Sequence, residues 1–109
     1  MIDPNNFQIT DLEKVTIIAV DGDLEITNIK RFEEWILDIG NKTNKDIALD
    51  FSKVNYLDSS GISVLLKLSK ILRQKKKKLQ LTKLPERISQ ILELSSLVDE
   101  LEENKIEII

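Results

Sequence analysis

Short apolar runs alternate with longer amphipathic stretches along this chain. The runs are rich in β-branched residues, have the lengths of strands and are bounded by polar or glycine-containing segments. They predict strands at Phe7–Leu12, Lys14–Val20, Ile47–Phe51 and Leu79–Thr82. Asp11-Leu12-Glu13 predicts a hairpin turn between the first two strands. The nearly continuous apolar run at Ile47–Phe51 predicts a strand buried on both faces.

The stretches between these runs carry apolar residues at three- and four-residue spacing, which is typical of helices with one buried face. We expect the first helix to begin after Thr27 or Asn28 as its N-cap and to end at Gly40-Asn41. The second covers Ile62–Leu72 and ends near Lys75–Lys78, because cations are favoured in the last turn of a helix.

A third helix is expected to follow Pro85, which suits the first helical position. Its apolar face would consist of Ile88, Ile91, Leu92, Leu94 and Leu97. The tail allows two interpretations. Asp99–Asn104 favours a solvated helix and Lys105–Ile109 alternates like a strand, but Val98–Leu101 can also be read as a short strand before a final helix.

The order of these elements predicts the fold class. After the opening hairpin each strand is followed by a helix, a pattern that requires parallel strands joined by crossover helices. We therefore expect one α/β domain over residues 1–109. It would have a small, single-layer, mainly parallel sheet of about four to five strands, an N-terminal antiparallel hairpin and about four flanking helices.

Composition restricts the chemistry. The chain has 109 residues, a formal net charge of -3, no Cys and no His. These absences remove cysteine nucleophiles, the commonest metal ligands and the Ser-His-Asp triad. There is no Gly-rich phosphate loop, no basic excess and no apolar run long enough to span a bilayer. We expect a cytoplasmic protein that is not an enzyme, with no cofactor, no metal site, no membrane contact and no direct nucleic-acid contact.

The most informative stretch is Asp58-Ser59-Ser60-Gly61, which joins the strand at Ile47–Phe51 to the following helix. Asp or Ser before a helix is a common N-cap. The turn also follows the carboxyl end of a strand, where ligands of open α/β sheets gather, and a helix N-terminus tolerates a phosphate. Both interpretations hold together if one side chain caps the helix while a hydroxyl faces outward.

The segment IALDFSKVNYLDSSGISVLLKLSKIL resembles the core of the STAS domain of bacterial anti-sigma factor antagonists. The shared features are the strand, the pair Tyr56-Leu57, and the Asp58–Gly61 motif that opens a helix. Weaker similarity extends to VDGDLEITNIKRF and LPERISQILELSSL, so that the resemblance covers roughly Phe7 to Val98. The sequence departs from the family pattern at Glu25, where Asp is usual, and at Ser96, where Gly is usual.

The resemblance implies a partner-switching cycle. Its second motif hydroxyl, Ser60, would be phosphorylated by a serine kinase that is also the anti-sigma factor and has a histidine-kinase-like ATPase fold. A PPM-type serine phosphatase would remove the phosphate, and the unphosphorylated domain would bind the kinase and release a sigma factor. Ser59 is the second choice for phosphorylation, with a capping or partner-contact role otherwise.

The expected partner-binding residues surround this turn, and Tyr56 is open to two interpretations because a partner contact and burial fit it equally well. The set comprises Asp23, Glu25, Tyr56, Asp58, Ser59, Ser60 and Gly61. The rival function is that of a non-catalytic STAS subunit of a lipid or anion transport system, although the intact Asp-Ser-Ser-Gly motif favours the phosphorylation switch.

Overall fold

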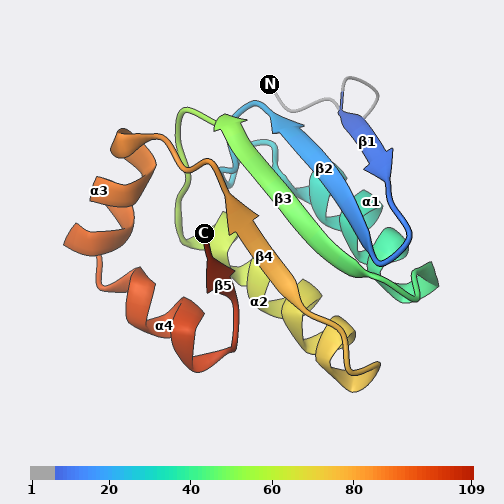
Figure 1. Ribbon diagram of the computed structural model, residues 1–109. Helices are drawn as coiled ribbons and strands as arrows, with labels where there is room; N and C mark the ends of the chain where they lie inside the picture. Colours follow the sequence, from blue (N-terminus) through green and yellow to red (C-terminus); the bar gives the residue numbers. More distant parts are fainter. Residues whose placement is uncertain (1–6) are drawn as a thin grey trace.

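The computed structural model describes residues 7–109 as alternating strands and helices (Figure 1). The elements are β1 (Gln8–Asp11), β2 (Val15–Asp21), α1 (Ile29–Lys42), β3 (Asp46–Lys53), α2 (Ser59–Gln74), β4 (Leu79–Thr82), α3 (Glu86–Leu94), α4 (Leu97–Glu103) and β5 (Glu107–Ile108). The predicted fold class is therefore confirmed. The hairpin turn falls one residue later than predicted, because Asp11 still belongs to β1 and Leu12 N–H donates to Val15 O at 2.9 Å.

The strands form a single sheet in the order β1-β2-β3-β4-β5, with β1 antiparallel to β2 and the other neighbours parallel. Figure 1 shows α1 and α2 behind this sheet, with α3 and α4 on its β4–β5 side. Among residues 7–109 the helices cover one face of the sheet. The predicted burial of β3 on both faces holds for Ala48, which is buried on the face without helices, but not for Asp50, which is half-buried. Alternate residues Ile47, Leu49 and Phe51 are fully buried, whereas Ala48 on the other face is 7% exposed because it is small and lies between β2 and β4.

The core lies between the sheet and α1 and α2. Its largest fully buried side chains are Phe32, Phe51, Ile18, Leu24, Ile36, Ile47, Leu49, Leu57, Ile62, Leu65 and Leu68. Phe7 extends this core at the β1 edge, where its ring meets Phe32 at 5.7 Å and Trp35 edge-on at 5.0 Å. The half-buried Trp35 thus packs against the core.

Gly40 lies inside α1 and does not end it. The helix continues to Lys42, so the predicted end at Gly40-Asn41 was wrong. A Cβ atom at Gly40 would lie 2.6 Å from Cδ1 of Leu68 on α2. A side chain at Gly40 would therefore meet Leu68, a contact between the two helices that the sequence of α1 alone does not reveal.

Lys75 is the C-cap residue of α2, but its charged amino group contacts the C-terminal end of α1. Its Nζ donates to the carbonyl oxygens of Gly40 at 2.9 Å, Asn41 at 2.6 Å and Thr43 at 2.9 Å. These carbonyls lie at the C-terminal end of α1, where a cation offsets the helix dipole. Lys75 thus stabilises the packing of α1 against α2.

The C-terminal part corrects three predictions. Leu94 was expected on the apolar face of α3, but its side chain is 88% exposed, whereas Ile88 and Leu92 are buried. Val98–Leu101 is not a strand, because it belongs to α4. Pro85 precedes α3 as its N-cap residue rather than opening it. The helix and strand alternative for the tail is confirmed.

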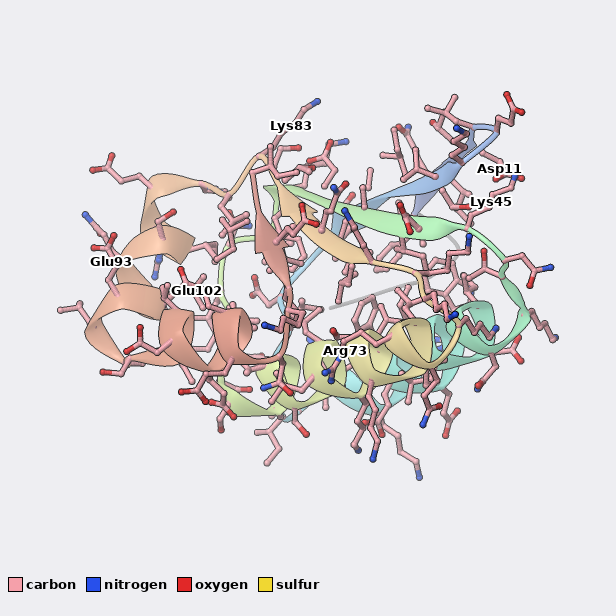
Figure 2. The ribbon with its side chains drawn as sticks, turned by 60° about the horizontal axis from the view of Figure 1, so that its bottom comes forward. Asp11, Lys45, Arg73, Lys83, Glu93 and Glu102 are labelled. Carbon is pink, nitrogen blue, oxygen red and sulfur yellow. The ribbon has the colours of Figure 1, made fainter. Side chains whose placement is uncertain are left out.

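An ion pair joins Asp11, at the end of β1, to Lys45, just before β3. Figure 2 shows Asp11 and Lys45 pointing toward each other, and Lys45 Nζ lies 2.7 Å from Asp11 Oδ1. The β1–β2 hairpin is thereby joined to the segment that enters β3, at the end of the sheet where β3 begins. The serine turn follows the opposite end of β3, so this pair has no part in it.

Candidate functional site

Two loops meet where β2 and β3 end, and they build the candidate site. Residues 22–28 follow β2 and residues 54–58 follow β3. Leu24 and Leu57 form an isolated parallel bridge, with Leu24 N–H donating to Tyr56 O at 3.0 Å and Asp58 N–H donating to Leu24 O at 3.1 Å. Both leucine side chains are buried. The parallel pairing of the strands is thus resumed in the loops and brings Glu25–Asn28 beside the serine turn.

Asp58 is the N-cap of α2. Its backbone is extended, and its Oδ1 accepts hydrogen bonds from Ser60 N–H at 2.9 Å, from Gly61 N–H at 3.4 Å and from the Ser60 hydroxyl. The carboxylate therefore satisfies donors that every helix N-terminus leaves free. Among residues 7–109 Ser59 makes no capping bond to α2, so the capping role considered for it was wrong.

The second oxygen of Asp58 reaches across to the other loop. Oδ2 accepts a hydrogen bond from Ile26 N–H at 3.1 Å, although Ile26 lies 32 positions earlier in the chain. One carboxylate therefore joins the start of α2 to the loop after β2. The loop after β2 thus lies beside the serine turn, and the contact is made through the backbone of Ile26.

The electrostatics of Asp58 follow from these contacts. Burial raises the pKa of the Asp58 carboxyl, but the donors around it, with the Ser60 hydroxyl the strongest of them, outweigh burial and hold the pKa below its ordinary value. The group is therefore a carboxylate at neutral pH. The Ser60 hydroxyl hydrogen points at it, which sets the orientation of the Ser60 oxygen.

Gly61 is buried beneath the turn. A Cβ atom there would lie 2.7 Å from Leu24 O, 2.8 Å from Leu57 Cδ1 and 2.9 Å from Leu24 Cβ. The motif glycine is therefore a packing requirement of the junction between the two loops. The expectation that Gly61 contacts a partner would have to hold through its backbone, because it has no side chain and little exposed surface.

The outer surface of the site is formed by residues of both loops. Ser59 is exposed, Ser60 is half-buried, and Tyr56 is 39% exposed. Ile26 is 76% exposed and was not singled out from the sequence. The only sequence signal for it was an apolar residue two positions after Leu24, which by itself suggests burial rather than a surface.

The two acidic residues of the loop after β2 have different surroundings. Glu25 is half-buried and organises its own turn, because its Oε1 accepts from the Thr27 hydroxyl at 2.9 Å and its N–H donates to Asn28 Oδ1 at 3.4 Å. Asn28 therefore occupies the N-cap position of α1 without capping it through its side chain. Asp23 Oδ1 is buried without a hydrogen-bond partner among residues 7–109.

The chemistry available around the Ser60 oxygen is limited among residues 7–109. Within residues 7–109 no group of three or more potential metal ligands gathers. The side chain that contacts the Ser60 oxygen is a carboxylate of lowered pKa, which is a weak base. What the arrangement can do is offer an oriented hydroxyl, at the positive end of a helix, to another protein.

A hollow lies elsewhere on the molecule. It has a volume of about 220 Å³ and is lined by residues of α3, α4, β5 and the loop before α3, including Leu84, Leu92 and Val98. Figure 2 shows Glu93 on α3 and Glu102 on α4, which both line it. No residue of the serine turn lines this hollow, so it is separate from the candidate site.

The single mainly parallel sheet, the helices on one face and the serine-bearing turn at the start of α2 define a small α/β interaction domain. The chain belongs to the STAS domain family, whose model matches residues 6–107. It is 27% identical over 94 residues to an anti-sigma-B factor antagonist of Staphylococcus aureus (strain NCTC 8325 / PS 47), covering 86% of this chain and 87% of that protein. The predicted family is confirmed.

Solved structures show the same fold. A Thermotoga maritima protein provisionally assigned as an anti-sigma factor antagonist superposes with a TM-score of 0.75 at 25% identity, covering 94% of this chain and 84% of that one. The anti-sigma factor antagonist SpoIIAA in its unphosphorylated form has a TM-score of 0.71 at 16% identity, with coverages of 94% and 87%. The murine anion transporter Slc26a9 has a TM-score of 0.72 at 17% identity, with 89% of this chain matching 16% of the transporter.

Replacing Asp58 with alanine is expected to lower the free energy of unfolding by about 1–2 kcal/mol at pH 7, because the cap of α2 is lost. The folded-state pKa of Asp58 lies below its ordinary value of 3.8, so its contribution is present above that pH and is lost as the pH falls through the folded pKa. Urea unfolding of both proteins at pH 7 and at steps below pH 4 measures the difference. Asp58→Asn is the control, because asparagine caps nearly as well and does not titrate. A difference that stays constant to the lowest pH would contradict the assignment.

Proposed function

We propose that this protein is an anti-sigma factor antagonist controlled by phosphorylation of Ser60. In its unphosphorylated form it binds a serine kinase that is also the anti-sigma factor and has a histidine-kinase-like ATPase fold, and this binding releases a sigma factor. A PPM-type serine phosphatase restores the unphosphorylated form. Residues 1–109 act as one STAS domain, which is a substrate and ligand in this cycle and not an enzyme.

The observation that carries the proposal is the oriented Ser60 hydroxyl. It lies at the N-terminus of α2, half-buried and hydrogen-bonded to Asp58, beside the exposed Ser59, Tyr56 and Ile26. A kinase needs an accessible hydroxyl in a defined position, and a binding partner needs exposed apolar surface next to it. Similarity to anti-sigma-B factor antagonists over most of the chain supports the same function.

The switch needs no large change of fold. A phosphate adds about -1.5 to -2 charges, which the positive end of the helix dipole partly offsets. The same charge lies beneath any partner that covers the turn, and burying an unpaired anion is costly. Phosphorylation therefore abolishes binding while the core remains intact.

Ser60 is preferred to Ser59 on the motif position, and the geometry adds a physical reason. The Ser60 hydroxyl is oriented by a carboxylate, whereas the exposed Ser59 side chain has no such bond among residues 7–109. Ser59 lies next to it on the surface and serves as a partner contact in this proposal, together with Asp23, Glu25 and Tyr56.

A second candidate is a regulatory role in a lipid or anion transport system. Its specific support is the similarity of this fold to a domain of Slc26a9, which shows the fold alone at 17% identity. Within residues 7–109 no helix has the length and apolar character needed to cross a bilayer. Neighbouring genes discriminate between the candidates, because a histidine-kinase-like ATPase or a PPM phosphatase favours the switch and lipid transporter genes favour the rival.

Incubation of the purified protein with ATP and a lysate of its source organism is expected to add one phosphate, on Ser60. Phosphopeptide mapping by mass spectrometry locates the phosphate. Ser60→Ala should lose the modification and Ser59→Ala should retain it, because only the Ser60 oxygen is oriented for transfer. Phosphate on Ser59 of the unmodified protein, or undiminished labelling of Ser60→Ala, would exclude Ser60 as the acceptor.

A further inference from the structure

A single carboxylate holds both the proposed acceptor and an exposed apolar residue of the other loop. Asp58 Oδ1 accepts from the Ser60 hydroxyl, and Asp58 Oδ2 accepts from Ile26 N–H at 3.1 Å. Ile26 is 76% exposed, so a movement of its backbone would shift an apolar side chain on the surface. The state of Ser60 and the position of Ile26 are therefore connected through one side chain.

We propose that phosphorylation of Ser60 releases Ile26 from Asp58 and so moves an apolar side chain on the surface that surrounds the serine. Asp58 is a positioning residue in this scheme, since it acts through Ser60 and Ile26 and touches no reacting phosphorus. The proposal rests on the proposed function for its biological meaning. Its physical content, a change at Ile26 caused by a phosphate on Ser60, stands apart from the identity of any partner.

The chemistry of the modification removes what Asp58 now accepts. Transfer of the γ-phosphoryl group of ATP forms the bond from Ser60 Oγ to phosphorus and breaks the bond between that phosphorus and the β-phosphate oxygen. ADP leaves with the bonding electron pair, and the hydroxyl proton passes to water. The donor that faces Asp58 Oδ1 is thereby replaced by a dianion. The phosphate oxygens also compete for the N–H groups of Ser60 and Gly61, which Asp58 Oδ1 accepts in the unmodified protein.

The expected movement is local. Repulsion between the phosphate and the Asp58 carboxylate displaces both carboxylate oxygens together, because they share one rigid group, and the Ile26 N–H loses its acceptor. Leu24 holds its position, since it is fully buried and its backbone bonds to Tyr56 and to Asp58 N–H do not involve the carboxylate. The change is therefore confined to the segment between Leu24 and the start of α1.

The test uses the full-length protein carrying phosphoserine at position 60, introduced by genetic encoding so that no kinase is required. Amide hydrogen exchange, followed by nuclear magnetic resonance, is compared with that of the unmodified protein. Exchange at Ile26 is expected to be at least about tenfold faster, which is the loss of one hydrogen bond to a charged group. Exchange at Leu24 should change by less than about twofold, because the bridge remains.

Two control proteins separate the connection through Asp58 from other effects. Phosphoserine at Ser63, an exposed position one turn later in α2, adds the same charge to the same helix and should leave Ile26 unchanged. Ser60→Ala removes the hydroxyl without adding charge, and Ile26 should stay within about threefold of the unmodified protein because Asp58 Oδ2 still accepts its N–H.

The proposal is overturned if phosphoserine at position 60 leaves Ile26 exchange unchanged, or if phosphoserine at position 63 or Ser60→Ala accelerates it equally. None of these outcomes bears on whether a kinase binds the domain, because no partner is present in the sample. Conversely, a protein that no kinase recognises would still show the faster exchange at Ile26.

Discussion

Gly61→Ala is expected to lower the free energy of unfolding by about 2–3 kcal/mol, the cost of overpacking a buried junction. The added methyl group would lie 2.7 Å from Leu24 O, a backbone atom, and 2.8 Å from Leu57 Cδ1. Relief requires the loop after β2 to move away from the start of α2. Such a movement would also stretch the hydrogen bond from Asp58 N–H to Leu24 O.

Urea denaturation followed by circular dichroism measures this loss. Ser63→Ala is the matched control, because it places the same methyl group in the same helix at an exposed position, where the change should stay within about 0.5 kcal/mol. If Gly61→Ala proved as stable as the control, the close approach of Leu24 to α2 would be wrong, and with it the geometry of the site.

Ser60→Asp is expected to weaken binding of the kinase by about 100-fold, because like charges at an interface cost several kcal/mol. The new carboxylate would lie beside Asp58 and would replace the hydroxyl donor that Asp58 now accepts. A partner that covers the turn would have to bury both anions. Ser60→Ala adds no charge and should bind within about threefold of the unmodified protein.

Isothermal titration calorimetry with the purified kinase measures the binding, and a lysate pull-down with the unmodified protein identifies that kinase. Ser63→Asp is the control for added charge on α2, and it should bind like the unmodified protein because Ser63 lies outside the serine turn. Equal affinity of Ser60→Asp and the unmodified protein would refute the switch. If Ser63→Asp weakened binding equally, the effect of Ser60→Asp would come from added charge on α2 in general and not from the serine turn.

Local patterns account for most of the fold. The apolar run at Lys14–Val20 predicts β2 because its β-branched residues favour extended backbone, and this preference acts within the strand itself. Asp58 before α2 was recognisable as a cap for the same reason, since the donors that it satisfies lie two and three residues away. Interactions within one element leave a signature in one stretch of sequence.

The wrong predictions concern residues whose surroundings are set by segments that are distant in the sequence. Gly40 was read as a helix end because glycine is common there, but it lies within α1, facing the side chain of Leu68 on another helix. Leu94 was placed in the core by its spacing, yet nothing covers that side of α3 among residues 7–109. Lys75 follows its own helix in sequence and neutralises the end of a different one. None of these partners can be identified from the spacing of residues.

The candidate site shows the same division. The sequence by itself determined the serine turn, its capping acid and its place between a strand and a helix, because these depend on neighbours within a few residues. Only the tertiary structure brought Ile26 to Asp58 across 32 positions and set Leu24 against Gly61. The physical reason is that the parallel pairing of β2 with β3 places their C-terminal loops side by side, and that register is set by the packed sheet.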